Sequence, residues 1–273
     1  GLVLSAVSGA TAVPVWDQAD ANAVIVRKDA WFVRTADGLT QEFSPTTGVP
    51  AAGEVTGPIH LAIGGLQPDY ATAAALAASY RGAGVRAWPA YEGGWQVWAG
   101  TYADVTAANA GKQATADLVG TSAITVLNAT GSRLVLFNTN MEPVCFYGGV
   151  DGYLTAVAKT GADLLFVNGK RYRGTMEFRR YSDSDLTLIN TLGIEPYLYG
   201  GVPSEIGALS PEEAIKAQAV AARTYTLKNI GRFSKWGFDL ADTVESQVYS
   251  GYEGEKVQTN LAIDATRGQK ALY

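Results

Sequence analysis

Five polar side chains between Tyr197 and Leu227 have the types and spacing needed for chemistry. This segment reads YLYGGVPSEIGALSPEEAIKAQAVAARTYTL. It begins with one carboxylate in a predicted loop and continues into an alanine-rich run with four more polar side chains. In chain order these residues are Glu205, Lys216, Gln218, Arg223 and Tyr225. Because one carboxylate can give and later take a proton, the simplest prediction is general acid–base chemistry at Glu205.

The composition excludes several other kinds of site. The chain has 273 residues, with one histidine (His60) and one cysteine (Cys145). No Ser-His-Asp or Cys-His machinery is therefore expected, and an intrachain disulfide is excluded. With 47% hydrophobic and 17% charged residues the chain is globular, and its length allows two domains. A net charge of −5 argues against nucleic acid and anionic membrane surfaces as partners.

A helix is expected to carry four of the five side chains. Ser210, Pro211 and Glu213 are the residue types of an N-cap, N1 and N3 in a capping box. The run 214–222 contains five alanines, which let other backbone approach closely and predict a helix at the centre of a domain. On such a helix two pairs of side chains point to opposite faces, namely Lys216 with Arg223 and Gln218 with Tyr225.

Glu205 is expected just before this helix. Glu195-Pro196 predicts the start of a short helix that ends at Gly200-Gly201, and Pro203-Ser204 then place Glu205 at a helix start or in a tight turn. An acid catalyst is kept protonated by burial against apolar groups. We therefore expect Glu205 to be buried against Ile206, Leu209 and the aromatic residues after position 235.

Four blocks of this region resemble the stage II sporulation protein D / amidase-enhancer (SpoIID/LytB) family. They are YLYGGVPSE, PEEAIKAQAVAARTYTL, GFDLADTVESQVYSGY and IDATRGQ, and they occur in the order found in that family. Characterised members are lytic transglycosylases that cleave peptidoglycan glycan strands lacking peptides. The resemblance implies an α+β catalytic domain with a central alanine-rich helix, an extracytoplasmic location in the cell envelope, and Glu205 as the catalytic acid/base.

The resemblance also implies roles for the central helix. Lys216, Gln218 and Arg223 match polar positions of the family, so Lys216, Gln218, Arg223 and the nearby Tyr225 are candidate substrate-binding residues. Arg223 could equally form a structural ion pair, with Asp239 or Asp242 as the expected partner. Two other functions stay open: a glycan-binding protein that activates a cell-wall amidase without cleaving glycan, and a structural envelope module with an inert Glu205.

The sequence departs from the family where characterised sporulation members bind zinc. Those proteins have cysteine and histidine in the loop after GFDL, whereas this chain has Ala241, Glu245 and Ser246 there. Carboxylate and hydroxyl groups alone make a poor zinc site. We therefore expect no metal and no cofactor.

Residues 58–128 contain an internal duplication. Each half reads as strand, helix, strand, which predicts a ferredoxin-like four-stranded sheet covered by two helices. This pattern resembles a SPOR domain, a module that binds peptide-free glycan strands. Trp95 and Trp98 must lie on opposite faces of such a sheet, and we expect Trp95 on the exposed, ligand-binding face.

The predicted domain organisation follows from these patterns. Residues 1–57 are a β-rich segment expected to belong to the catalytic domain, 58–128 an inserted SPOR-like domain, and 129–273 the catalytic domain. The family usually continues beyond the last block, so the catalytic domain is expected to be incomplete at its C-terminal end. The start of the chain lacks the basic residues of a signal peptide, so any signal or membrane anchor is expected outside this sequence.

Overall fold

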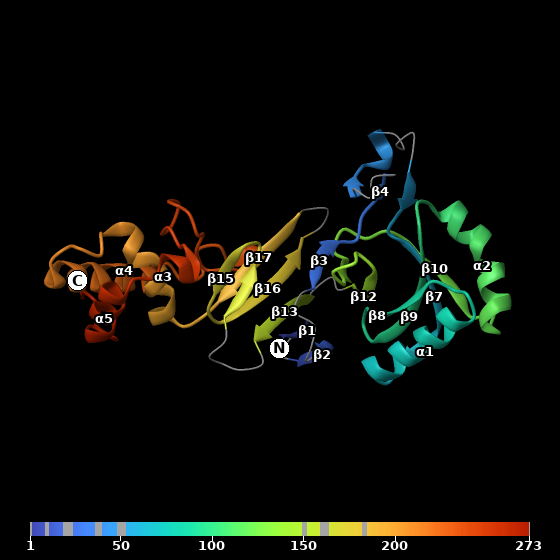
Figure 1. Ribbon diagram of the computed structural model, residues 1–273, viewed down its shortest axis with the longest axis horizontal. Helices are drawn as coiled ribbons and strands as arrows, with labels where there is room; N and C mark the ends of the chain where they lie inside the picture. The colour runs from blue at the N-terminus through green and yellow to red at the C-terminus, as the bar shows by residue number, and fades with distance from the viewer. Residues whose placement is uncertain are drawn as a thin grey trace. The chain divides into compact units, whose positions relative to one another are not determined.

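The computed structural model describes residues 2–8, 11–18, 24–35, 40–47, 53–148, 152–158, 164–181 and 185–272 (Figure 1). Its helices and sheets confirm the α+β class. Contacts divide the chain into a first unit, Gly1–Thr155 with Phe178–Leu188, and a second unit, Ala156–Glu177 with Ile189–Tyr273. The predicted boundaries after residues 57 and 128 both fall inside the first unit, and the insertion of 58–128 into a catalytic domain stays a prediction.

The first unit contains the predicted duplication. Asp69 and Asp104 cap its two helices, each accepting a 2.7 Å hydrogen bond from a backbone N–H of the first turn. The elements in chain order are β7 (Ile59–Gln67), α1 (Tyr70–Gly82), β8 (Ala87–Tyr91), β9 (Trp95–Tyr102), α2 (Val105–Val119) and β10 (Ile124–Leu127). Figure 1 shows both helices on the same side of these strands.

The sheet is larger than the four strands predicted. β8 pairs in parallel with β12 (Pro143–Tyr147), and β11 (Leu134–Phe137) and β3 (Ile25–Lys28) extend the sheet further. The full order is β10-β7-β9-β8-β12-β11-β3. β8 is buried over most of its length, so an unpaired edge there would leave buried backbone groups without partners. The likeness to a SPOR domain stays a prediction.

Both tryptophans of β9 belong to the core. Trp95 is 3% exposed and packs against Tyr70 of α1, whereas Trp98 is fully buried and stacks on His60. They lie on opposite faces, as the alternation predicts. The expectation that Trp95 faces a ligand was wrong, because α1 covers its face of the sheet.

The structure also contains two smaller sheets. A three-stranded sheet has the order β5-β4-β6 and a five-stranded sheet the order β17-β16-β13-β1-β2. Asp37-Gly38, a dipeptide typical of hairpin turns, lies outside the described residues. The bounds are β1 Leu2–Ser8, β2 Thr11–Gln18, β4 Phe32–Arg34, β5 Thr40–Glu42, η1 Pro45–Thr47, β6 Glu54–Thr56, β13 Gly152–Ala158, β16 Thr175–Arg180 and β17 Leu186–Thr191.

The second unit is built on three helices, α3 (Ile194–Glu205), α4 (Glu212–Asn229) and α5 (Val257–Ala265). Its core places alanines of α4 against larger side chains of α3 and α5; the buried residues are Leu198, Val202, Ile215, Ala219, Ala222, Ala262 and Ile263. The alanine run thus allows the close approach expected of a central helix. Two short 3-10 helices, η2 (Ser234–Trp236) and η3 (Gly251–Gly254), lie between α4 and α5.

Two local sequence signals in the second unit have different outcomes. Asn168-Gly169 is a dipeptide typical of a two-residue hairpin turn, and β14 (Leu165–Val167) and β15 (Lys170–Tyr172) pair around it, with φ 49° and 82° as this turn requires. The capping box at the start of α4 was wrong. Pro211 is extended (ψ 139°) and occupies the N-cap without a side-chain hydrogen bond, so the helix begins one residue later than predicted.

Candidate active site

Helix α3 was predicted to end at Gly200-Gly201. This was wrong, because the helix continues to Glu205. Gly200 is needed for a close contact: a Cβ there would lie 2.6 Å from the Tyr249 ring and 2.8 Å from the Gly251 carbonyl oxygen. The backbone N–H of Ser250 also donates to the Gly200 carbonyl at 3.1 Å. The glycine therefore marks where a distant loop packs against the helix, and not where the helix stops.

Glu205 is the last residue of α3 and is exposed. The helix ends there because Ile206 is extended, with φ −139° and ψ 134°. The expected burial of Glu205 was wrong, and Leu209, one of its predicted neighbours, is 99% exposed. The carboxylate faces the negative end of the helix dipole and has no hydrogen bond or ion pair to any residue that the structure describes.

Tyr197 connects Glu205 to the rest of the site. Burial, together with the smaller effect of the charges of Tyr225, Glu205 and Asp242, raises the pKa of Tyr197 to about 12. Tyr225, Glu205 and Asp242 therefore each lie within electrostatic reach of Tyr197 in the second unit. They come from both ends of α3, from α4 and from the loop after α4.

Gln247 holds this region together, and the sequence analysis assigned it no role. It is 8% exposed, and its side-chain oxygen accepts hydrogen bonds from Thr226 (2.8 Å) and from the Tyr197 hydroxyl (3.3 Å). The Tyr197 ring also stacks on Tyr249 at 5.3 Å. Gln247 and Tyr249 both lie in the block GFDLADTVESQVYSGY that resembles the family, and this block was the sequence signal for their role in the site.

The candidate binding residues of α4 that share a face are both half-buried. Tyr225 accepts a 3.3 Å hydrogen bond from Arg232, which also donates to the Glu245 carbonyl at 3.0 Å. Gln218 lies two turns earlier on the same face. The structure thus places Tyr225 in the region of Glu205 through their shared neighbour Tyr197, and it leaves part of Gln218 accessible.

Arg223 is a structural residue in this fold. It is 1% exposed, and its guanidinium donates to both oxygens of Glu195, at 3.0 and 2.7 Å. Further hydrogen bonds reach the carbonyl oxygens of Gln269 and Ile263. An ion pair was one of the two predicted roles, but the partner is Glu195 and not Asp239 or Asp242. No surface of Arg223 is left for a substrate.

Lys216 takes part in local ion pairs. Its ammonium lies 2.7 Å from a Glu212 oxygen and 2.9 Å from a Glu213 oxygen, on the first turn of α4. The hydrogen bonds that Lys216 donates to both carboxylates raise its pKa. Such exposed pairs exchange readily with other acceptors, so Lys216 stays a candidate substrate contact.

The loop after α4 holds the carboxylates that could serve as a second catalytic group. Asp239 accepts a 2.8 Å hydrogen bond from the Gly231 N–H and so shapes the turn after α4. Asp242 is exposed and lies within electrostatic reach of Tyr197. Asp242 and Glu205 therefore both act on Tyr197, which makes Asp242 a candidate second carboxylate.

The described residues contain no group of three His, Cys, Asp or Glu side chains placed to hold a metal. In the loop where the family has zinc ligands, the Ser246 hydroxyl instead accepts a 3.2 Å hydrogen bond from the Ala241 N–H. Glu245 is exposed. This set does not fit zinc, and the absence of a metal or cofactor stays a prediction.

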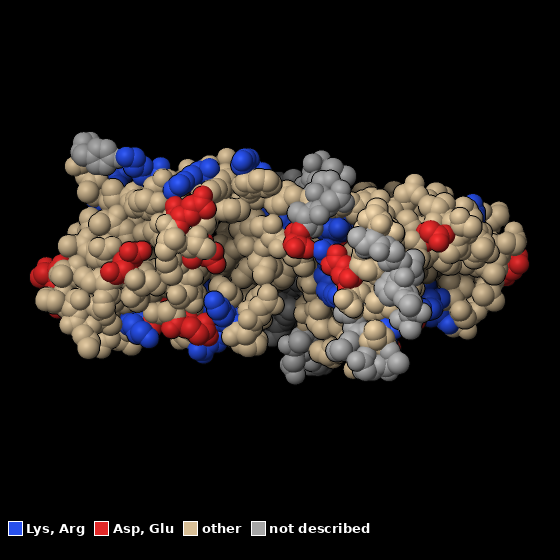
Figure 2. Space-filling model, turned by 90° about the horizontal axis from the view of Figure 1, so that it is seen from above, with Lys and Arg blue, Asp and Glu red and all other residues tan. Residues whose placement is uncertain are grey.

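Figure 2 shows acidic and basic side chains interspersed over one face of the molecule, among the residues drawn in colour.

No helix in the described ranges combines the length and the hydrophobicity needed to cross a bilayer.

Comparison with known proteins identifies one family model and two relatives. Residues 182–273 match the family model described as SpoIID, stage II sporulation protein. An uncharacterized protein of Brachyspira hyodysenteriae is 41% identical over 112 residues, 41% of this chain and 30% of that protein. The amidase enhancer of Bacillus subtilis is 38% identical over 110 residues, 40% of this chain and 15% of that protein. The chain thus spans less than a third of these relatives, and no solved structure matches it.

Proposed function

Because residues 182–273 form a SpoIID-family domain, we propose that this part of the chain is a lytic transglycosylase acting on peptide-free glycan strands of the bacterial cell wall. The observation that carries the proposal is Glu205, an exposed carboxylate with no hydrogen bond or ion pair among the described residues, within electrostatic reach of Tyr197.

In the proposed reaction Glu205 first acts as an acid. It gives its proton to the glycosidic oxygen as the bond from that oxygen to C1 of the muramic acid breaks. The carboxylate then takes the proton of the muramic acid 6-hydroxyl, whose oxygen attacks C1 and closes a 1,6-anhydro ring. No water is consumed, so one carboxylate is sufficient.

The exposure of Glu205 is compatible with this role if the substrate itself excludes water. A glycan strand lying over the end of α3 would cover the carboxylate and exclude water from it. Tyr225 and Gln218 on one face of α4, with Lys216 nearby, would contact the strand. Trp95 and Arg223 have no part in the proposal, because both are buried.

Products distinguish this reaction from hydrolysis. Peptide-free glycan would be digested with the protein and the fragments analysed by mass spectrometry, for the wild type, Glu205→Gln and the control Glu213→Gln. We expect anhydro ends from the wild type and the control, and none from Glu205→Gln. Reducing ends would instead indicate a hydrolase, with Asp242 as its second carboxylate.

A second candidate function is supported by the name of one relative, the amidase enhancer of Bacillus subtilis. In that case the chain would bind glycan strands and stimulate a cell-wall amidase without cleaving glycan. Absence of cleavage by the wild type, together with faster peptide release by an added amidase, would favour this function. Both candidates place the protein outside the cytoplasm, in the cell envelope.

A further inference from the structure

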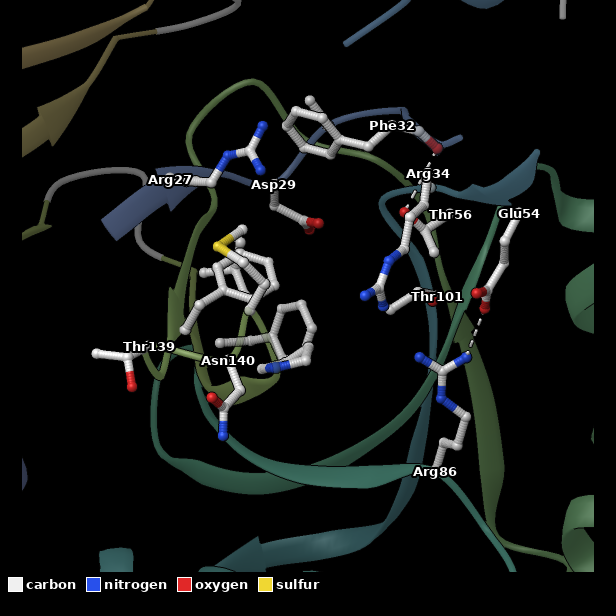
Figure 3. Close-up of a pocket in the computed structure, with 17 residues that line it drawn as sticks. Arg27, Asp29, Phe32, Arg34, Glu54, Thr56, Arg86, Thr101, Thr139 and Asn140 are labelled. Carbon is white, nitrogen blue, oxygen red and sulfur yellow. Dashed lines mark hydrogen bonds and ion pairs between the residues drawn. The ribbon is translucent and has the colours of Figure 1, made fainter. Parts of the chain in front are cut away.

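The first unit contains a cavity of about 240 Å³ between the three-stranded sheet β5-β4-β6 and the seven-stranded sheet (Figure 3). All of its lining residues lie between Arg27 and Phe146, outside the SpoIID domain. The cavity is therefore separate from the proposed catalytic site. It combines charged side chains with an apolar lining.

Five charged residues line the cavity, and two of them lack partners. Arg86 lies 3.3 Å from Glu54, and the Asp29 carboxylate lies 3.0 Å from the ring of the buried His60. Arg27 and Arg34 make no hydrogen bond or ion pair with any residue in the described part of the chain. In Figure 3 their guanidinium groups approach the cavity from two sides, with Asp29 between them. With three arginines against two carboxylates, the lining has a formal charge of +1.

Arg27 is half-buried, which makes its lack of a partner costly. Its guanidinium lies 4.0 Å from the centre of the Phe32 ring. Burial lowers the pKa of Arg27, and the charge of Glu42 offsets this only in part. A desolvated cation without an acceptor is unfavourable unless an anion joins it.

The uncharged lining indicates what kind of anion would fit. Apolar side chains of β11, β12 and neighbouring segments form much of the wall; they are Phe32, Val135, Phe137, Met141, Pro143 and Phe146. These groups favour a ligand with an apolar body. The planar fork of a guanidinium matches a carboxylate in a bidentate pair.

We propose that this cavity binds a small organic carboxylate, with its anionic group held by the Arg27 and Arg34 guanidinium groups on the side away from Asp29 and its body against the apolar wall. The ligand is limited in size, because drug-sized molecules occupy pockets of roughly 300–1,000 Å³. Inorganic phosphate would satisfy the arginines but leave the apolar wall without a partner.

The proposal can be tested by comparing how carboxylates and their neutral amides bind to the whole chain. Binding of benzoate, cyclohexanecarboxylate, the two matching amides and inorganic phosphate would be measured by ligand-observed NMR. The variants are Arg34→Gln, Arg27→Gln and the control Arg267→Gln. Arg34 is exposed, so its replacement should not affect folding, and Arg267 is an exposed arginine of the second unit.

We expect saturable binding of at least one carboxylate, with its amide and phosphate weaker by about tenfold or more, as expected when a charge-assisted hydrogen bond is lost. Arg34→Gln should weaken the carboxylate by a similar factor, and Arg267→Gln should leave it unchanged. Binding of neither carboxylate, equal binding of the amides or of phosphate, or binding unaffected by Arg34→Gln would each overturn the proposal.

Discussion

Helix α3 carries a glutamate near each end, and the fold treats the two in opposite ways. Glu195 is 6% exposed, and its two oxygens accept hydrogen bonds from the buried Arg223. Glu205 is exposed and has no partner among the described residues. A buried charge with its partner links segments of the chain, whereas an exposed charge without one is free to meet a substrate. The comparison separates a structural carboxylate from the candidate catalytic one.

The largest expected effect is on activity at Glu205. Replacement by glutamine keeps the shape but removes the proton transfer, so glycan cleavage should fall by about 10²–10⁴. Urea unfolding should be unchanged within about 0.5 kcal/mol, because the side chain is exposed. A loss of stability that accounts for the loss of activity would remove the distinction between the two glutamates.

The opposite result is expected at Glu195. Glu195→Gln leaves the buried Arg223 charge uncompensated and should destabilise the protein by about 3–5 kcal/mol in urea unfolding. The double variant Glu195→Leu with Arg223→Met removes both charges and should recover much of this loss. A single variant as stable as wild type would show that the pair does not hold the helices together.

A smaller effect is expected in the middle of the same helix. Gly200→Ala would force a Cβ to 2.6 Å from the Tyr249 ring and should cost about 1–3 kcal/mol. Gly201→Ala is the matched control, since its Cβ would meet only the Val248 carbonyl at 3.8 Å. Thermal unfolding of the two variants would measure the difference. Equal stability would mean that the loop does not pack closely on α3.

The smallest effect is a dependence on alkaline pH. The pKa of Tyr197 is raised from 10.0 to about 12, so the unfolded chain ionises first. Its stabilising contribution is complete below pH 10 and is lost as the pH rises through 12. Tyr197→Phe should therefore lose less stability over this interval in circular dichroism. In Glu205→Gln the Tyr197 titration should shift to lower pH, and an unchanged titration would contradict their proximity.

Several features of the fold could be predicted because their signals are local. The two helices that start after Asp69 and Asp104, and the hairpin at Asn168-Gly169, follow from capping and turn residues close to them in sequence. The end of α3 could not be predicted this way. Gly200 resembles a helix terminator, and only the packing of Tyr249, far along the chain, explains why it lies inside the helix.

For the candidate sites, the sequence by itself determined Glu205 as the carboxylate to test and the helix that carries Gln218 and Tyr225. Only the tertiary structure decided that Glu205 is exposed, that Trp95 is core and that Arg223 pairs with Glu195. It also brought Arg27 and Arg34 together in the lining of one cavity, and no motif in the sequence indicates a site at either arginine. The physical reason is that turns and periodicity depend on neighbours in sequence, whereas burial and charge pairing depend on segments brought together by folding.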